Sequence, residues 1–186
     1  MKLNLGCGFN HLAGFVNIDN NPACKPDRLL NLERADPPLN EALDFAIPRW
    51  PDSGSVDEVA AHHVLEHVNN FTGLMQWLYR VMKPGALMDI RLPHPRSDLY
   101  IGDPTHVRPL TADSFALLSR KECARYREAG ASNTPLADML GVDFEIVSNE
   151  AMVSPEFRGQ SRGEIQFAVR HFWNVIDELR IVVRRV

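Results

Sequence analysis

Cysteines are few in this sequence, and long apolar runs are missing. The three cysteines, Cys7, Cys24 and Cys123, form no Cys-x-x-Cys pair, which argues against a disulfide framework and against a zinc site built from such pairs. No run of about 18 apolar residues occurs, and the N-terminus has no basic region followed by an apolar segment. We therefore expect a cytoplasmic protein without a membrane-spanning segment.

An excess of charge of one sign is also lacking. The formal net charge is −4, from 20 Lys and Arg against 24 Asp and Glu, which argues against a nucleic-acid partner held by broad phosphate neutralisation. Hydrophobic residues make up 45% of the 186 positions and charged residues 24%, an ordinary composition for one domain with a sizeable core. A single domain over residues 1–186 is expected.

Two segments near the N-terminus, LNLGCG at 3–8 and GFVNID at 14–19, have the outline of a βαβ nucleotide-binding unit. Gly6 and Gly8 allow a sharp turn in which the backbone comes close to a ligand. Asp19 ends the second apolar run and is placed to accept hydrogen bonds from two ribose hydroxyls. The expected ligand therefore carries a ribose.

The same segments lack the third glycine of a dinucleotide fingerprint, because position 11 is His. Only residues 9–13 separate the second glycine from Gly14, so a helix there has at most about one turn and a weak dipole for phosphate. The acidic residue also follows Gly8 by only eleven positions. These features favour a ligand without phosphates and argue against a nicotinamide-dependent oxidoreductase.

Two further segments, WPDSGSVDEVAAHHVLEHV at 50–68 and RVMKPGALMDIRLP at 80–93, follow in order. Together with the glycine turn and Asp19, they resemble the class I S-adenosylmethionine-dependent methyltransferases, in particular small members of the methyltransferase type 11 kind. The resemblance covers about the first half of the chain. It departs from the family in the shortened first helix, in one extra residue between Asp52 and Gly54, and in Ala86, where a second glycine is usual.

The resemblance implies an α/β fold with a doubly wound, Rossmann-like sheet that is mostly parallel and has an antiparallel last strand. It implies S-adenosyl-L-methionine as cofactor and S-adenosyl-L-homocysteine as product. The cofactor-binding residues expected from it are Leu5, Gly6, Cys7, Gly8, Asp19, Asn20, Asn31, Leu32, His62 and His63. For Asn31, a turn-forming side chain bonded to its own backbone is an equal alternative.

Apolar periodicity and capping residues predict the remaining elements. Strands are expected at 2–5, 28–32, 56–63, 86–92, 142–152 and 179–186, and helices at 71–82, 111–118, 119–129 and 164–175, with a helical turn or two within 39–45. The first strand starts almost at residue 1, so the site is expected to be more open than in relatives with N-terminal helices. Residues 93–109 and 154–163 are expected to form the acceptor pocket.

Methyl transfer needs few catalytic groups, since the protein must mainly orient the acceptor, exclude water and in some cases remove a proton. Neutral imidazole suits proton removal at pH 7, and His63, His67 and His106 are the candidates, with Asp103 orienting His106. Asp103 could equally belong to an Asp-Pro turn. For His67, in the LEH segment, the resemblance implies a scaffolding or cofactor-side role.

No metal site is expected, because the spacing of His94, Asp103 and His106 matches no known ligand pattern. Cys7 is expected to fill a tight turn and not to act as a nucleophile. Family members that methylate exocyclic amines carry Asn/Asp-Pro-Pro-aromatic after the fourth strand, where this chain has His62-His63-Val64-Leu65. That substrate class is therefore not expected.

Two functions remain open. The first is methyl transfer from S-adenosylmethionine to an oxygen, nitrogen or carbon of a small molecule or an exposed polymer group. The second is a non-catalytic S-adenosylmethionine-binding module or subunit that supports a partner chain. The sequence identifies neither the acceptor nor the oligomeric state.

Overall fold

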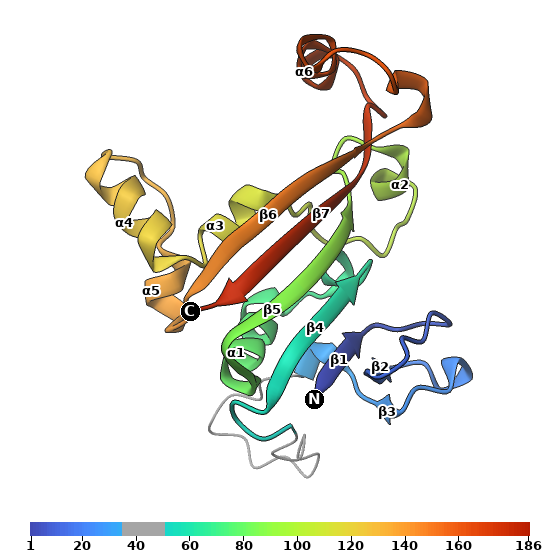
Figure 1. Cartoon of the computed structure of the whole chain (residues 1–186), viewed down its shortest axis with the longest axis vertical. Helices are drawn as coiled ribbons and strands as arrows, with labels where there is room; N and C mark the ends of the chain where they lie inside the picture. The colour runs from blue at the N-terminus through green and yellow to red at the C-terminus, as the bar shows by residue number, and fades with distance from the viewer. Residues whose placement is uncertain (35–50) are drawn as a thin grey trace.

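The computed structural model describes residues 1–34 and 51–186, which form a seven-stranded sheet with the strand order β3-β2-β1-β4-β5-β7-β6 (Figure 1). Neighbouring strands from β3 across to β5 pair in parallel, and β7 runs antiparallel to both β5 and β6. The predicted fold class, a mostly parallel Rossmann-like sheet with an antiparallel last strand, is confirmed. The expected short helix at 39–45 lies outside the described residues.

The strands are β1 Lys2–Leu5, β2 Val16–Asp19, β3 Arg28–Leu29, β4 Val56–His62, β5 Met82–Pro93, β6 Phe144–Val153 and β7 Ile176–Arg185. The α-helices are α1 Phe71–Val81, α2 Asp98–Ile101, α3 Ala112–Ala116, α4 Arg120–Glu128, α5 Leu136–Leu140 and α6 Arg162–His171. Short 3₁₀ helices are η1 Pro22–Cys24, η2 Leu32–Arg34, η3 Leu65–His67 and η4 Pro155–Phe157. No helix in the described ranges is long and apolar enough to cross a membrane.

The order in which successive strands are added to the sheet reverses between β1 and β4. The chain moves outward from β1 through β2 to β3, then returns to place β4 on the other side of β1. Leu3 and Leu5 of β1 are fully buried at this centre. Because ligands bind beyond the carboxyl ends of the strands at such a reversal, the residues that follow β1, β2 and β4 define the candidate site.

No helix forms between β1 and β2, and buried amides hold the loop instead. The side chain of Asn4, 3% exposed, donates to the carbonyl of Asn10 at 3.0 Å. The side-chain oxygen of Asn17 accepts from the amide of Leu12 at 2.8 Å. These bonds satisfy backbone groups that a helix would otherwise pair internally. The sequence predicted a helix of at most about one turn here, and the loop contains no helix.

Helix α1 is the main cover of the central strands. Asn70 caps it, accepting from the amide of Gly73 at 3.1 Å. Its buried face carries Leu74, Trp77 and Leu78, each at most 1% exposed. This face packs into the apolar core that also contains the inward side chains of β4 and β5.

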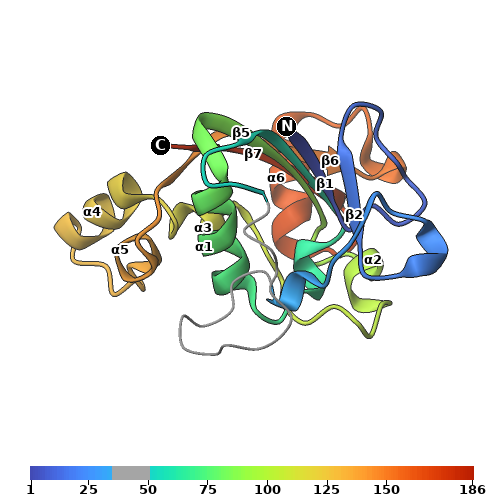
Figure 2. The ribbon, with the colours of Figure 1, turned by 90° about the horizontal axis from the view of Figure 1, so that it is seen from below.

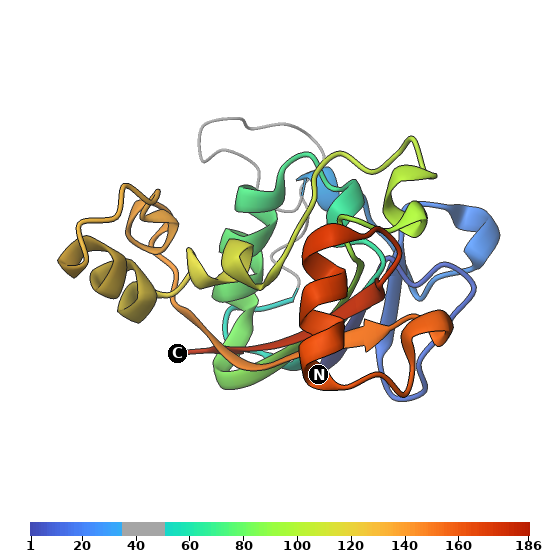
Figure 3. The same cartoon turned by 90° about the horizontal axis from the view of Figure 1, so that it is seen from above.

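The described helices leave one face of the sheet uncovered. Figures 2 and 3, seen along the sheet, place α1, α3 and α6 on the same side, and the opposite face is the one toward the viewer in Figure 1. Burial along β5 follows this arrangement, since Met88 and Ile90 are fully buried whereas Leu87 is 41% exposed. Parallel sheets are usually covered on both faces, so the open face needs polar side chains.

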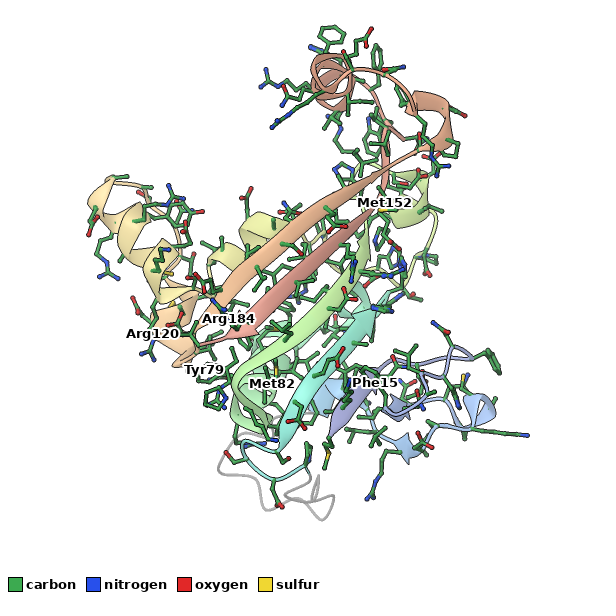
Figure 4. All side chains as sticks on the ribbon, in the orientation of Figure 1. Phe15, Tyr79, Met82, Arg120, Met152 and Arg184 are labelled. Carbon is green, nitrogen blue, oxygen red and sulfur yellow. The ribbon has the colours of Figure 1, made fainter. Side chains whose placement is uncertain are left out.

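Ion pairs supply that polar surface. On neighbouring strands, Arg180 of β7 holds Asp89 of β5 with two bonds of 3.0 and 3.1 Å. Lys2 pairs with Glu58 at 2.6 Å. Arg184, labelled on β7 in Figure 4, pairs with Glu145 of β6. Opposite charges on facing positions, and on diagonal positions for Asp89 and Arg180, thus give the front of the sheet a polar surface in place of a helix layer.

Several element boundaries differ from the sequence predictions. The third strand is only Arg28–Leu29, and the fifth is longer than predicted, starting at Met82. Helix α5 was not predicted; its five residues lie between Pro135 and Gly141. Ser119 caps α4, since its hydroxyl accepts from the amide of Glu122 at 3.4 Å.

Candidate cofactor and active site

The glycine turn after β1 is shaped by protein packing as well as by ligand access. Gly6 and Gly8 have φ of +59° and +48°, a region that favours glycine. A β-carbon on Gly6 would lie 2.4 Å from a methyl group of Val64. Next to Gly8 there is open space within 4 Å. The sequence interpretation, that both glycines admit a ligand, therefore omits the packing constraint at Gly6.

Cys7, between these glycines, is a packing residue. It is 4% exposed, and its amide donates to the carbonyl of Ile18 at 2.9 Å. Burial raises the pKa of the Cys7 thiol, and the charge of Asp19 raises it further. A buried thiol with a raised pKa is a poor nucleophile, which agrees with the role expected from the sequence.

Asp19, at the end of β2, ties the turn together. One carboxylate oxygen accepts from the amide of Gly8 at 2.8 Å, and the other accepts from the amide of Asn21 at 2.8 Å. Each carboxylate oxygen has a further lone pair. Asp19 can therefore hold the glycine turn in place and still accept bonds from two hydroxyls of a ligand.

A cavity of about 230 Å³ opens at the carboxyl ends of β1, β2 and β4. Six predicted cofactor-binding residues line it: Gly6, Asp19, Asn20, Asn31, Leu32 and His63. Five others line it, of which only His67 had been given a cofactor-side role, as one of two alternatives: Leu30, Glu33, Val64, His67 and Val68. Among the described lining residues none is Lys or Arg, whereas two are carboxylates. This lining suits a ribose-bearing, positively charged ligand better than one with phosphates.

The remaining predicted cofactor residues, Leu5, Cys7, Gly8 and His62, are not among those that line the cavity. Leu5 is fully buried in the core. His62 lies on the open face of the sheet, where its Nε2 is 3.6 Å from Asp89, and burial lowers its pKa. Of the two adjacent histidines, His63 is therefore the one at the cavity.

Asn31 and Glu33 follow β3 and close one wall of the cavity. The side-chain oxygen of Asn31 accepts from the amide of Glu33 at 3.0 Å, which is the turn-forming alternative considered for this residue. Glu33 accepts from the amides of Asn69 and Asn70 at 2.7 and 2.9 Å. It thereby fastens the segment after η3 to the segment after β3. No local pattern in the sequence indicated this long-range anchor.

His63 combines an unusual backbone conformation with two carboxylate neighbours. Its φ is +53°, which is uncommon for a residue other than glycine and marks functional positions more often than ordinary ones. Its Nε2 bonds Glu178 of β7 at 2.7 Å, and its Nδ1 is 3.7 Å from Glu66. The carboxylates of Glu66 and Glu178 raise the pKa of His63 against the opposing effect of burial. The ring is 49% exposed at the cavity.

His106 lies behind the cavity and not over it. Its side chain is 7% exposed, it stacks on Tyr100 at 5.0 Å between ring centroids, and it contacts His67 at 4.6 Å. Its Nδ1–H donates to the carbonyl of Tyr100 at 2.6 Å. The backbone carbonyl therefore orients this ring.

Asp103 does not hold His106 in the way that the sequence suggested. One oxygen of Asp103 accepts from the amide and the hydroxyl of Thr105, at 2.8 and 2.6 Å. The other is 4.0 Å from Nε2 of His106, which is beyond hydrogen-bond distance. The turn-forming role that was the alternative for Asp103 is the one seen in this geometry.

Comparison with known proteins agrees with this fold and cavity. Residues 3–89 match the family described as "Methyltransferase domain". A methyltransferase dependent on S-adenosylmethionine from Archaeoglobus fulgidus superposes with a TM-score of 0.60 at 16% identity, covering 99% of this chain and 85% of that one. No curated protein matches the chain significantly.

Two other solved structures have similar folds. One is an S-adenosylmethionine-dependent methyltransferase from Mesorhizobium loti, with a TM-score of 0.53 at 17% identity over 99% of this chain and 90% of that one. The other is the Haloferax volcanii complex of the Trm112 methyltransferase activator with a putative methyltransferase, with a TM-score of 0.53 at 12% identity over 99% and 81%. At such identities these structures show the fold alone.

The fold and the cavity at the glycine turn agree with the resemblance to the class I S-adenosylmethionine-dependent methyltransferases. The family match over residues 3–89, just under half of the chain, supports the same resemblance. S-adenosylmethionine, the predicted cofactor, is the one on which the Archaeoglobus fulgidus and Mesorhizobium loti enzymes depend.

Proposed function

We propose that the chain transfers a methyl group from S-adenosylmethionine to an oxygen, nitrogen or carbon of a small molecule or an exposed polymer group. The observation that carries this proposal is the cavity at the ends of β1, β2 and β4, with Asp19 on its wall beside the glycine turn. Its carboxylate-containing lining fits a cofactor that has a ribose and a positively charged sulfur. When bound, the cofactor supplies a methyl group whose bond to sulfur breaks, with the electron pair leaving on sulfur.

In this proposal His63 receives the proton of an oxygen or nitrogen acceptor. It is the imidazole at the cavity, and Glu178 orients it through the 2.7 Å bond to Nε2. With that nitrogen protonated toward Glu178, the Nδ1 lone pair is available to an acceptor proton. An imidazole held by a carboxylate is a stronger base than a free one.

We assign His106 and Asp103, the other predicted catalytic residues, to positioning. Both act on His67, which lines the cavity: His106 by ring contact at 4.6 Å, and Asp103 through Thr105, whose hydroxyl bonds Nδ1 of His67 at 2.9 Å. Their replacement should therefore affect the shape of the cavity before it affects proton transfer.

The test is a methylation assay over a panel of hydroxyl, amine and carbon acceptors, with S-adenosylhomocysteine binding measured alongside. Replacing His63 by Asn keeps a residue that tolerates positive φ and removes the base. We expect kcat to fall by about 10²-fold or more for an oxygen or nitrogen acceptor, while the variant still binds S-adenosylhomocysteine. An unchanged kcat would remove His63 from proton transfer.

The second candidate is a binding subunit that supports a partner chain. It is favoured by exposed aromatic side chains on α6 and just after it, Phe167, Phe172 and Trp173, each at least 50% exposed. The Haloferax volcanii complex is a similar fold seen with a methyltransferase activator. Binding of S-adenosylhomocysteine without turnover of any acceptor in the panel would favour this candidate.

A further inference from the structure

Glu66 is buried without a hydrogen-bond partner. It follows β4 in η3, its side chain is 1% exposed, and both carboxylate oxygens lack a hydrogen-bond partner within the described parts of the chain. An ionised carboxylate in such a position is costly unless a cation or donors compensate it. Its backbone carbonyl is bonded to the amide of Val107 at 2.9 Å, so η3 is fixed against the loop after β5.

His106 directs an unprotonated nitrogen toward this carboxylate. Its Nδ1 faces the carbonyl of Tyr100 at 2.6 Å, and a carbonyl only accepts, so Nδ1 carries the proton. In the neutral ring Nε2 then has the lone pair. That atom lies 4.0 Å from an oxygen of Glu66.

His67 is oriented by the same kind of contact. The hydroxyl of Thr105 donates to Asp103 at 2.6 Å, because an ionised carboxylate cannot donate. The hydroxyl oxygen must therefore accept from Nδ1 of His67 at 2.9 Å. This leaves Nε2 as the unprotonated nitrogen of His67 in its neutral form.

One ligating atom from each of Glu66, His67 and His106 lies within 4.8 Å of the others. Two neutral imidazoles with Nδ1–H bonded to oxygen acceptors, grouped with a buried carboxylate, are the donor set and the outer contacts of a transition-metal site. Zn²⁺ and similar ions bind such atoms at about 2.0–2.2 Å, so small side-chain rotations would bring the three donors onto one ion.

We propose that Glu66, His67 and His106 bind a divalent first-row transition-metal ion of the Zn²⁺ or Co²⁺ type. The two imidazole ligands favour such ions over Mg²⁺ and Ca²⁺. Three protein ligands leave coordination positions open, as in metal sites that bind a substrate or water. The sequence spacing did not predict this site, because Glu66 and His106 are forty residues apart and were considered in different groups.

The ion would lie at the wall of the cofactor cavity, since His67 lines that cavity and Nδ1 of His63 is 3.7 Å from Glu66. Its open positions suit an oxygen of the methyl acceptor, which makes hydroxyl-bearing compounds the favoured acceptor class. This assignment of the acceptor rests on the proposed function. The metal site itself does not.

The test is a Co²⁺ titration of the chelator-stripped protein, followed by visible absorption. The wild type should bind one equivalent, with the absorption bands of a site containing nitrogen and oxygen ligands. Glu66→Gln and His106→Ala should lower the affinity about tenfold or more. His171→Ala is the matched control, because His171 is exposed on α6 and contacts Phe167, and it should bind like the wild type.

Thermal melting in chelator separates a metal ligand from a structural residue. Metal-free Glu66→Gln should be at least as stable as the metal-free wild type, since Gln removes a buried carboxylate that has no hydrogen-bond partner in the described parts of the chain. The proposal is overturned if the wild type does not bind Co²⁺ or if Glu66→Gln binds it as tightly as the wild type. It is also overturned if His171→Ala lowers the Co²⁺ affinity as much as the ligand variants do. S-adenosylhomocysteine binding, measured without metal, tests the cofactor site independently, so either conclusion can fail while the other stands.

Discussion

At Gly6 two physical constraints coincide in one residue. Its φ of +59° favours glycine, and a β-carbon would lie 2.4 Å from Val64. Gly8 has a similar φ of +48° but open space where its β-carbon would be. The pair therefore separates the cost of backbone strain from the cost of a steric clash.

We expect Gly6→Ala to lower the free energy of unfolding by clearly more than Gly8→Ala. Positive φ alone costs about 1–2 kcal/mol for a non-glycine residue, and overpacking adds about 1–3 kcal/mol at Gly6 only. Urea unfolding of both variants measures the difference. Equal destabilisation would mean that Val64 moves aside and that packing does not require this glycine.

The residues of the site were predicted unevenly, for physical reasons. The glycine turn and Asp19 follow one another closely in the sequence, so their function could be predicted from spacing. Glu33 could not, because its bonds to Asn69 and Asn70 connect segments more than thirty positions apart. For His106, the loop position did not indicate that the ring stacks on Tyr100, and the residue is not among those that line the cavity.

The open face of the sheet is the main feature at the scale of elements. Strands of parallel sheets are usually apolar on both sides, but β5 over residues 86–92 and β7 over residues 179–184 alternate buried and more exposed positions. The resemblance correctly predicted a mostly parallel sheet with an antiparallel last strand. The loss of the helix between β1 and β2, which its five intervening residues indicated, is one reason that this face is uncovered.

The Asp89–Arg180 pair on that face gives a pH-dependent prediction. Burial raises the pKa of Asp89, but bonding and charge from Arg180 outweigh it and hold the pKa below its usual range. A carboxyl group whose pKa is lower in the folded than in the unfolded state stabilises the fold at pH values above its unfolded pKa of about 3.9. That contribution is lost as the pH falls through the lower folded value.

Asp89→Asn should therefore lower the free energy of unfolding by about 1 kcal/mol at pH 7. The difference from the wild type should shrink as the pH falls below about 4. Urea unfolding across this range measures it, with Asp52→Asn as a control at an exposed aspartate. A deficit that persists unchanged in acid would show that the ion pair does not cause it.

At the scale of the whole molecule, the site joins segments from both halves of the chain. Asp19 comes from β2 and His63 from the end of β4, while Glu178 of β7 reaches His63 from 115 positions away. The family match ends at residue 89, so the contribution of β7 and of the loop after β5 could not be carried over from the resemblance. These contacts form only when the whole sheet is assembled, and they do not depend on any local motif.

Two segments were predicted to form the acceptor pocket, residues 93–109 and residues 154–163. The loop after β5 supplies the contacts behind the cavity through Thr105 and His106. Residues 154–163 contain η4 and lead into α6, near the top of Figure 1. Hydrogen exchange measured with and without S-adenosylhomocysteine would test whether these two segments cover the acceptor. Ligand-dependent protection is expected in both, and identical exchange in the two states would argue that neither covers the acceptor.

The central claim, that the cavity at the glycine turn binds S-adenosylmethionine through Asp19, is tested most directly by calorimetry with S-adenosylhomocysteine. The wild type should bind with a 1:1 stoichiometry, and Asp19→Ala should weaken binding about tenfold or more by removing charge-assisted hydrogen bonds. Asp19→Asn keeps one acceptor for the amide of Gly8 and controls for loosening of the turn, and Asp52→Ala, at the opposite end of β4, should bind like the wild type. Unchanged affinity in both Asp19 variants would contradict the account.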